Sequence, residues 1–426
     1  MSEILSERSF YRCSTVNGDE GSNKILASRR AIKRRKILHD LSKEQPDSDF
    51  GDKNQHVAKE KVETLLDEMM SEEKTGHIDL EQFSSDIIDT QKAEKEKQEK
   101  IIRPRVDPET KSFTLFPGQG SQFVGMGKEL LHFPGVQTIY DQASEILRYD
   151  LLKLCLYGPK SELDKTIFCQ PAVFVTSIAA IERLKEENFQ GIENTVGTAG
   201  FSIGEYAALV FAGVLSFEDA LKVVKVRAEA MQSASEETPS GMMTVFTFWG
   251  TKLPLAMAAA RQYCKDHHGI EDPVCNVANY LFPEVKVIAG NEQALEFIEK
   301  NYKDFGIRKC KRVPVSGAFH TGLMESAKKP VRDALKTVEI NPYKFPVYSN
   351  VEFQKFSLIP KKFYRLLTNQ IVKPVRWEQI MTQLYSRDKK QAKFPYTYEC
   401  GPGNQLGMFL QKMNNRAYEN YVKIEV

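Results

Sequence analysis

The stretch of sequence that decides the fold is TVGTAGFSIGEYAALVFA, which occupies residues 195–212. Its first six residues are small and apolar, as in a buried strand, whereas its last part repeats apolar residues at helical spacing. The segment GFSIG (residues 200–204) lies between these two parts and matches the pattern G-x-S-x-G. A strand before this pattern and a helix after it are the context in which it forms a sharp turn that exposes the serine.

Ser202, at the centre of this pattern, is a candidate nucleophile. The small residues on either side allow a strained turn, which presents the hydroxyl group at a helix N-terminus. There, free N–H groups and the helix dipole favour a developing negative charge. A serine that only caps the following helix is the alternative interpretation, because capping is a common role for this residue.

The sequence on both sides of this turn predicts an α/β fold. From Ser112 onward, short apolar runs alternate with segments of helical periodicity, a pattern typical of layered folds with a mostly parallel sheet. Residues 241–313 differ, because their pattern has the β-α-β-β-α-β order of a ferredoxin-like unit. We therefore expect a large domain formed by residues 111–240 and 314–426, with a small ferredoxin-like subdomain inserted between its two parts.

The expected elements follow from the same periodicities. Strands are expected at residues 112–117, 195–201, 242–248, 274–279, 285–289, 308–313, 345–348 and 396–400. Helices are expected at residues 172–185, 203–212, 217–233, 254–266, 294–302, 322–335, 361–372 and 377–386.

Residues 1–110 differ in composition from the rest of the chain. They hold 20 Lys and Arg against 24 Asp and Glu, a net charge of −4, whereas the remaining residues carry +6, which together give the +2 of the whole chain. With few aromatic residues, such a segment buries too little apolar surface to offset the entropy cost of ordering. We therefore expect a low-complexity region that is largely disordered or forms isolated surface helices.

Residues 23–36 (NKILASRRAIKRRK) within this region carry seven Lys and Arg and no acidic residue. A basic stretch that also contains Ser and Ala is typical of an organelle transit segment. Four acidic residues precede it, however, and mitochondrial presequences are poor in acids. A nuclear-type basic run and a solvated basic helix therefore remain alternatives.

Composition argues against several other classes of protein. No window approaches the eighteen or more uninterrupted apolar residues of a membrane-spanning helix, so we expect no membrane span. The seven cysteines are scattered, without a C-x-x-C pair or a histidine at zinc-finger spacing, so neither a disulfide scaffold nor structural zinc is expected. A reducing compartment, with these cysteines as small core residues, fits best. We expect no nucleic-acid partner either.

His320 is the candidate base for a serine nucleophile. It lies in a loop of small residues, VPVSGAFHTGLME (residues 313–325), between an expected strand and an expected helix. This position suits the base of a layered α/β enzyme, and a buried, hydrogen-bonded histidine is the alternative. No acidic residue completes the usual Ser-Asp-His order, so a neutral partner that orients His320 stays open.

Two further features belong to the expected site. The glycine-rich segment FPGQGSQ (residues 116–122) follows the first expected strand, where its backbone N–H groups can form the second half of an oxyanion hole. A phosphate-binding loop is the rival interpretation, although the segment lacks the Lys-Ser/Thr ending of a Walker loop. Arg227 lies between Val226 and Ala228, either as a snorkelling surface residue or as a fork for a substrate carboxylate.

Six segments, taken in their order and spacing, resemble the malonyl-CoA:acyl-carrier-protein transacylase family, and its mitochondrial animal members most of all. The similarity extends from about Phe113 to Met413. The six segments are FPGQGSQ (116–122), GFSIGE (200–205), VKVRAEAMQ (224–232), SGAFH (316–320), QIVKPVRW (370–377) and YECGPGNQLG (398–407). The resemblance implies an α/β-hydrolase-like large domain with a parallel sheet and a ferredoxin-like small subdomain, in agreement with the periodicities.

The resemblance also implies roles for single residues. Ser202 is expected to be the acylated nucleophile and His320 its base. The backbone carbonyl group of Gln370 is expected to orient the histidine, in place of an acid. The backbone N–H groups of Gln119 and Ile203 are expected to form the oxyanion hole.

Other residues are expected to select the substrate. Arg227 matches the arginine that holds the malonyl carboxylate with two hydrogen bonds, which favours the fork interpretation. Phe319 and Ile203 fit the malonyl selectors of related polyketide acyltransferases, and a bulky Phe319 would crowd a 2-methyl group. Phe201 is a departure, because bacterial members usually carry histidine before the serine, and this changes the expected hydrogen bonding around the acyl thioester.

The activity implied is ping-pong transfer of a malonyl group from malonyl-CoA to the phosphopantetheine thiol of acyl carrier protein, supplying fatty acid synthesis in the mitochondrial matrix. No metal and no separate cofactor is expected. Both partners are anionic, which suits the +6 charge of the chain after residue 110. Arg308, Lys309, Lys311 and Arg312 are candidate docking charges, or else a solvated strand face. A serine hydrolase such as a thioesterase, which releases the acid to water, is the alternative function.

Overall fold

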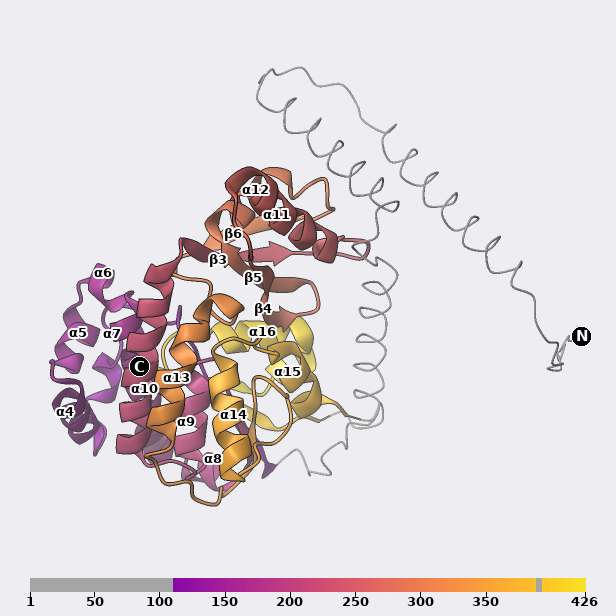
Figure 1. Ribbon diagram of the computed structural model, residues 1–426. Coiled ribbons are helices and arrows are strands. Elements are labelled where there is room, and N and C mark those ends of the chain that lie inside the picture. The colour runs from indigo at the N-terminus through magenta and orange to yellow at the C-terminus, as the bar shows by residue number, and fades with distance from the viewer. Residues whose placement is uncertain (1–109, 388–392) are drawn as a thin grey trace, which may run out of the picture. The chain divides into compact units, whose positions relative to one another are not determined.

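The computed structural model describes residues 110–387 and 393–426, which form two sheets and their surrounding helices (Figure 1). The larger sheet has five strands in the order β7-β2-β1-β8-β9, and its pairings are parallel. Its strands are β1 (Ser112–Phe116), β2 (Thr195–Gly200), β7 (Val347–Tyr348), β8 (Tyr396–Cys400) and β9 (Tyr421–Ile424).

Helices connect these strands, because neighbouring parallel strands need long crossover segments. Before β7 they are η3 (Lys128–Leu130), α4 (Val136–Leu147), α5 (Leu151–Tyr157), α6 (Lys160–Leu163), α7 (Thr166–Glu187), α8 (Phe189–Glu193), α9 (Gly204–Phe211), α10 (Phe217–Glu237), η4 (Gly322–Ala327) and α13 (Lys328–Leu335). After β7 they are α14 (Pro360–Gln370), α15 (Trp377–Tyr385), α16 (Gln405–Met413) and α17 (Asn415–Tyr418).

Strand β1 shows why helices cover both faces of this sheet. All of its residues are buried, and successive side chains point to opposite faces. Phe113 and Leu115 belong to the apolar core that contains Trp377 of α15. Phe116 belongs to the core on the other face, which contains Phe174 of α7. β1 is therefore buried on both sides, as central parallel strands are.

The second sheet is antiparallel and has four strands in the order β4-β5-β3-β6. Its elements follow one another as β3 (Ser240–Phe246), α11 (Leu253–His268), β4 (Cys275–Phe282), β5 (Val285–Asn291), α12 (Glu292–Asn301) and β6 (Lys309–Val313). This is the β-α-β-β-α-β order expected from the sequence. The predicted fold class, a parallel sheet with a separate ferredoxin-like unit, is confirmed.

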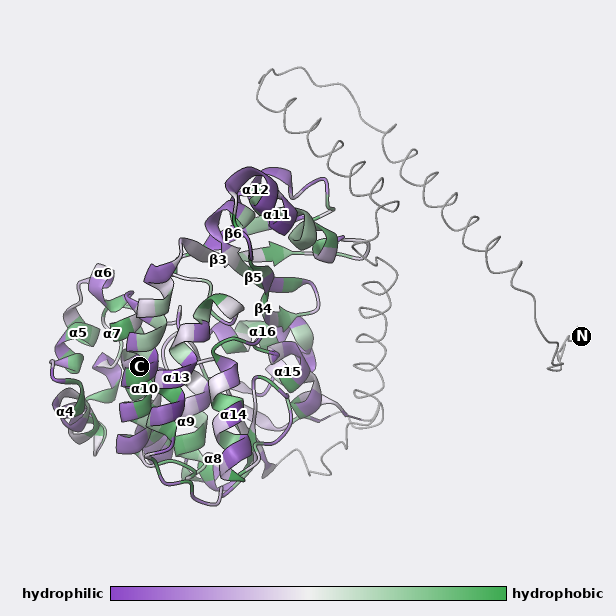
Figure 2. Ribbon diagram, in the orientation of Figure 1, coloured by the Kyte–Doolittle hydropathy of each residue, from purple (hydrophilic) through white to green (hydrophobic). Residues whose placement is uncertain are grey.

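The two faces of the antiparallel sheet have different roles. Met243 and Val245 of β3 belong to a core shared with α11 and α12. Figure 2 shows hydrophilic residues along α12, whereas β5 beneath it is hydrophobic. The alternate residues Met242, Thr244 and Phe246 point to the other side of the sheet, where they line a pocket. The antiparallel sheet thus contributes one wall of that pocket.

Among the described helices, α7 is long enough, and over its most apolar window hydrophobic enough, to cross a membrane by length and composition alone. In the structure 72% of that window is buried inside the protein. Such burial is the property of a core helix, and α7 packs against α10, α9 and α4.

The six described cysteines are free, and all except the half-buried Cys310 are buried. Residues 1–109, which include the basic segment 23–36, lie outside the described residues.

Candidate active site

The turn between β2 and α9 presents Ser202 to the pocket. Strand β2 ends at Gly200, helix α9 begins at Gly204, and Ser202 has a φ of 53° in the left-handed region. A Cβ atom at Gly200 would lie 1.9 Å from the backbone of Gly204, and one at Gly204 would lie 2.3 Å from the carbonyl oxygen of Phe116. Both positions therefore require glycine, which is the steric reason for the spacing of the motif.

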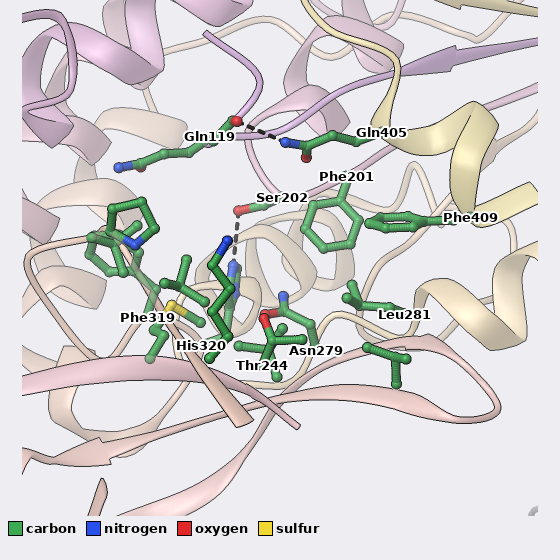
Figure 3. A pocket seen from close by; sticks show the side chains of 18 of the residues that line it. Gln119, Phe201, Ser202, Thr244, Asn279, Leu281, Phe319, His320, Gln405 and Phe409 are labelled. Carbon is green, nitrogen blue, oxygen red and sulfur yellow. Dashed lines mark hydrogen bonds between the residues drawn. The ribbon is translucent and has the colours of Figure 1, made fainter. Parts of the chain in front are cut away.

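His320 lies beside this serine, in the loop that joins β6 to η4. Its Nε2 atom lies 2.9 Å from Oγ of Ser202 (Figure 3), and its Nδ1 atom lies 2.6 Å from the backbone carbonyl oxygen of Gln370. A carbonyl oxygen can only accept a hydrogen bond, so Nδ1 carries the proton. Nε2 is then free to accept the proton of the serine hydroxyl group.

The environment of His320 keeps its imidazole ring neutral. Burial lowers the pKa of His320 to about 3, and the positive charge of Arg227 acts in the same direction. The hydrogen bond to the carbonyl group of Gln370 opposes this shift, because it favours the protonated ring. At neutral pH the ring therefore has an unprotonated Nε2, as a general base requires.

Arg227, on α10, is completely buried, which excludes the snorkelling interpretation. Its Nη1 donates to Oε1 of Gln170 at 2.5 Å, and its Nη2 donates to Oγ of Ser202 at 3.2 Å and to Oε1 of Gln370 at 2.8 Å. These acceptors are neutral. The Nε–H group of Arg227 has no hydrogen-bond acceptor among the described residues. Burial lowers the pKa of Arg227, yet an arginine starts so high that it keeps its charge. Because burying an unpaired charge is costly, a cation in this position favours the binding of an anionic group.

Two buried residues that the sequence analysis did not single out support the turn. Oδ1 of Asn350 accepts from the backbone N–H of Ser202 at 2.7 Å, and its Nδ2 donates to the carbonyl oxygen of Gly200 at 2.7 Å. The carboxylate of Glu205 accepts from the backbone N–H of Asn350 at 2.6 Å and from the side-chain amide of Gln370. An acidic residue in the apolar segment EYAALVF was a signal for Glu205, whereas nothing in the sequence marked Asn350.

The two candidate oxyanion-hole groups belong to two separate segments of the chain, the nucleophile turn and the loop after β1. Ile203 precedes the first residue of α9, and Gln119 lies in the loop after β1 (Figure 3). Among the described residues, no protein acceptor takes a hydrogen bond from either backbone N–H group. The loop comes close to the turn at Gly118, where a Cβ atom would lie 2.6 Å from the carbonyl oxygen of Phe201.

The pocket in front of Ser202 has a volume of about 570 Å³ and a mainly apolar wall (Figure 3). The antiparallel sheet lines one side of it, and the loops after β1 and β2 line another, together with Met408 and Phe409 of α16. Phe319 lines it beside His320. Within the two described ranges, no group of three or more His, Cys, Asp or Glu side chains could hold a metal ion.

Comparison with known proteins identifies the family. The acyl transferase domain family matches residues 113–394. The mitochondrial malonyl-CoA-acyl carrier protein transacylase of Homo sapiens is 50% identical over 315 residues, which cover 74% of this chain and 80% of the relative. The chain belongs to the malonyl-CoA-acyl carrier protein transacylase family. The probable mitochondrial transacylase of Drosophila melanogaster is 46% identical over 363 residues, 81% of this chain and 95% of the relative.

Solved transacylase structures share the fold. The malonyl CoA-acyl carrier protein transacylase of Coxiella burnetii has a TM-score of 0.66 at 30% identity, covering 75% of this chain and 95% of that one. A malonyl-transacylase in complex with its type II PKS acyl-carrier protein has a TM-score of 0.64 at 29% identity, covering 74% and 96%. The predicted family, and with it the prediction of an acyltransferase, is confirmed.

Two neighbours of Ser202 in this transacylase, Phe201 and Ile203, have surroundings that the sequence did not predict. The side chain of Ile203 is buried in the core and is not one of the described residues that line the pocket, so it does not support a role in substrate selection. Phe201, where bacterial relatives were expected to carry histidine, packs edge-on against Trp377 with ring centroids 5.5 Å apart, and lies 6.3 Å from the ring of Phe409. It makes that side of the transacylase pocket apolar.

The basic residues around β6 of the transacylase separate into two groups. Arg312 forms ion pairs with Glu292 at 2.7 Å and Glu299 at 3.1 Å on α12, so its charge is already matched. Lys309 and Lys311 are exposed and alternate with it along the strand, and Lys311 lines the pocket. Arg308, just before the strand, is also exposed.

Proposed function

We propose that this transacylase transfers the malonyl group of malonyl-CoA to the phosphopantetheine thiol of acyl carrier protein through an ester on Ser202. The observation that carries the proposal is the buried Arg227, whose protein partners are neutral and whose Nη2 lies 3.2 Å from Oγ of Ser202. A guanidinium group in such a place can hold the free carboxylate of malonate while the thioester carbon reaches the serine.

In the first half-reaction, Oγ of Ser202 attacks the thioester carbon and its proton passes to Nε2 of His320. The backbone N–H groups of Gln119 and Ile203 stabilise the resulting oxyanion. The bond between carbon and sulfur then breaks, and His320 returns the proton to the sulfur of CoA. A malonyl ester of Ser202 and free CoA thiol are the products.

In the second half-reaction, the thiol of the carrier protein attacks the ester carbon and gives its proton to Nε2 of His320. The tetrahedral intermediate uses the same two N–H groups, and its collapse breaks the bond to Oγ of Ser202. The proton then returns from His320 to Oγ, so that the free enzyme is restored. Throughout, the carbonyl group of Gln370 keeps the imidazole oriented. Every step of the proposed reaction uses this chain's own groups and the two thiols.

A serine hydrolase is the alternative, because it would use the same Ser202 and His320 but let water attack the ester. Two features favour transfer. A lipase has no use for a cation such as Arg227 beside its nucleophile, and the apolar wall formed by Phe201 and Phe409 leaves few polar partners for a water molecule. Phe319 is proposed to restrict the acyl group, since its ring lines the pocket beside His320.

The carrier protein is proposed to dock beside the pocket on Arg308, Lys309 and Lys311. These cations are exposed, and acyl carrier protein is anionic, so charge complementarity would speed association and place the thiol at the entrance. Arg312 is left out of this surface because Glu292 and Glu299 pair with it.

The N-terminal region is proposed to determine the location of the protein in the cell. The relatives are named mitochondrial in human, mouse and fly, and residues 23–36 are basic, so we propose delivery to the mitochondrial matrix by the N-terminal region.

We propose two domains, because each of the two sets of strands forms its own sheet. The large domain comprises residues 111–240 and 314–426, and the small domain comprises residues 241–313.

Intact-mass spectrometry tests the proposed reaction. The full chain is mixed with malonyl-CoA, and a mass increase equal to one malonyl group is expected, followed by its loss when carrier protein with a phosphopantetheine thiol is added. The carrier protein should gain the same mass. Release of free malonate, with no gain on the carrier, would instead identify a hydrolase.

A further inference from the structure

Glu205 is a buried carboxylate that the proposed reaction does not use. It lies in the first turn of α9, is fully buried, and is not one of the described residues that line the pocket. One of its oxygens accepts from the backbone N–H of Asn350 at 2.6 Å, and the other accepts from Nε2 of Gln370. A buried acid is costly unless both of its oxygens are satisfied, so a group in this place needs an explanation.

The side-chain amide of Gln370 connects Glu205 to Arg227. Its Nε2 donates both to Glu205 and to the backbone carbonyl oxygen of Ser202 at 2.8 Å, and its Oε1 accepts from Nη2 of Arg227 at 2.8 Å. If the amide were turned over, its NH₂ group would face the guanidinium and its oxygen would face two other oxygens. Glu205 therefore favours the one amide orientation in which an oxygen faces Arg227.

We propose that Glu205 is a positioning residue for substrate recognition: through the amide of Gln370 it holds Arg227 in the orientation that binds the free carboxylate of the acyl donor. The proposal rests on the proposed function, in which Arg227 binds that carboxylate. A carboxylate in direct contact with Arg227 would occupy the guanidinium fork and compete with the substrate. Placed one side chain away, Glu205 in its ionised form supplies a compensating negative charge and leaves the fork open.

An isosteric amide at position 205 breaks this arrangement. The carboxylate accepts at both oxygens, whereas the amide of E205Q accepts at only one. The NH₂ group of the new glutamine must then face another donor, either the N–H of Asn350 or the NH₂ of Gln370. The orientation of the Gln370 amide is therefore no longer fixed. The effect should appear with donors that carry a free carboxylate and spare those that lack one.

Steady-state kinetics with malonyl-CoA and acetyl-CoA at pH 9, where Glu205 is mostly ionised, test the proposal on the full chain. For E205Q we expect kcat/KM for malonyl-CoA to fall about 10- to 100-fold, mainly through KM, and kcat/KM for acetyl-CoA to change less than about threefold. E399Q is the matched control, because Glu399 is also buried and accepts from the backbone N–H of Gly407 and from the hydroxyl group of Tyr421. It should lower the melting temperature without changing the ratio of the two substrates.

The pH dependence of the same ratio is a readout that does not need a variant. Burial raises the pKa of Glu205 to about 8, while its two hydrogen bonds and Arg227 act against that shift. The other titratable groups that face this cluster are Arg227, Tyr206 and His320. Burial raises the pKa of Tyr206 and lowers the pKa of His320 to about 3, and an arginine keeps its charge even though burial lowers its pKa. Protonation of Glu205 places an O–H against a donor, so the preference for malonyl-CoA should fall as the pH is lowered from pH 9 to pH 6.

The outcomes separate the inference from the proposed function. A wild-type chain that forms no malonyl ester contradicts the proposed function itself. A wild-type chain that forms the ester, together with a folded E205Q whose substrate ratio equals that of wild type, overturns only the role of Glu205. Should E205Q fail to fold, the wild-type pH profile decides: a falling ratio supports the proposal, and a constant ratio between pH 6 and pH 9 overturns it.

Discussion

The backbone carbonyl oxygen of Gln370 lies 2.6 Å from Nδ1 of His320, in the place where many serine enzymes have an acid. The choice of a neutral acceptor follows from the charge of the site. Arg227 is buried close by, and a carboxylate at this place would pair with it and compete with the carboxylate of the substrate. A carbonyl group fixes the ring of His320 without adding a charge.

Removal of the nucleophile is the first prediction. Ser202→Ala should form no malonyl adduct, because the only hydroxyl group at the turn is lost, while its melting temperature should stay close to that of wild type. Intact mass and thermal unfolding measure the two properties. A variant that still accumulates covalent malonate would show that another residue is acylated.

Removal of the base is expected to slow the reaction. His320→Ala should lower the rate of acylation by about 10²–10⁴-fold, the range typical for a positioned general base. Rapid-quench measurement of the adduct gives this rate directly. Wild-type acylation by the variant would contradict the role of His320.

The charge of Arg227 is expected to determine the preference for malonyl-CoA. Truncating one member of a buried charge pair costs about 2–5 kcal/mol, so Arg227→Ala should lower kcat/KM for malonyl-CoA about 30- to several-thousand-fold. Acetyl-CoA has no such pair to lose, and its kcat/KM should stay the same or rise. Equal losses for the two substrates would assign Arg227 a structural role.

The pH profile of acylation follows from the pKa of His320. A base acts only above its pKa, and burial together with Arg227 lowers this one from 6.5 to about 3. The acylation rate with acetyl-CoA, which does not use Arg227, should therefore stay constant from pH 8 down to pH 5 and fall only as the pH approaches 3. Stopped-time assays of CoA release measure this. A decline centred near pH 6.5 would indicate an ordinary, solvated histidine.

The glycine before the nucleophile is expected to be essential for stability. Gly200→Ala brings a Cβ atom to 1.9 Å from the backbone of Gly204, so the free energy of unfolding should fall by more than about 3 kcal/mol. Gly322→Ala is the control, because the added carbon has no atom within 4 Å beyond its own local backbone and chain neighbours, and no positive φ is required. Denaturant unfolding of the two variants gives the comparison, and equal stabilities would contradict the steric argument.

The basic segment 23–36 is expected to direct the protein to mitochondria. Residues 1–60 fused to a fluorescent reporter should give a mitochondrial signal. Replacing the seven Lys and Arg of the segment by Gln should abolish that signal. A nuclear or diffuse cytosolic signal from the unmodified fusion would refute the proposal.

Local patterns allowed most of the fold to be predicted. The expected strand at 195–201 and the helix at 203–212 correspond to β2 and α9, because the turn between them is defined by residues close in sequence. One helix was expected at 322–335, but the structure divides it into η4 and α13. Pro330 lacks the backbone N–H that a continuous helix would need, whereas the first turn of a new helix tolerates it.

Features that depend on distant partners could not be predicted in the same way. Strand β9 has only four residues and exists because β8 lies beside it, and no expectation included it. Asn350 reaches the nucleophile turn because β7 pairs with β2, with Thr198 opposite Val347. Sequence spacing does not encode that adjacency. The pairing of Ser202 with His320 was expected because the residue types themselves suggested it.

The strand order also has a consequence for the order in which the molecule folds during synthesis. β1, the first described strand, lies between β2 and β8, and β8 comprises residues 396–400, far from β1 along the chain. Until those residues leave the ribosome, one edge of β1 stays unpaired, and unpaired edges of apolar strands readily join other chains. The nucleophile turn can form early, but β1 gains its second neighbouring strand only after the long segment between β2 and β8 has been synthesised. Chaperone protection of the nascent chain is therefore most valuable before residue 396 emerges.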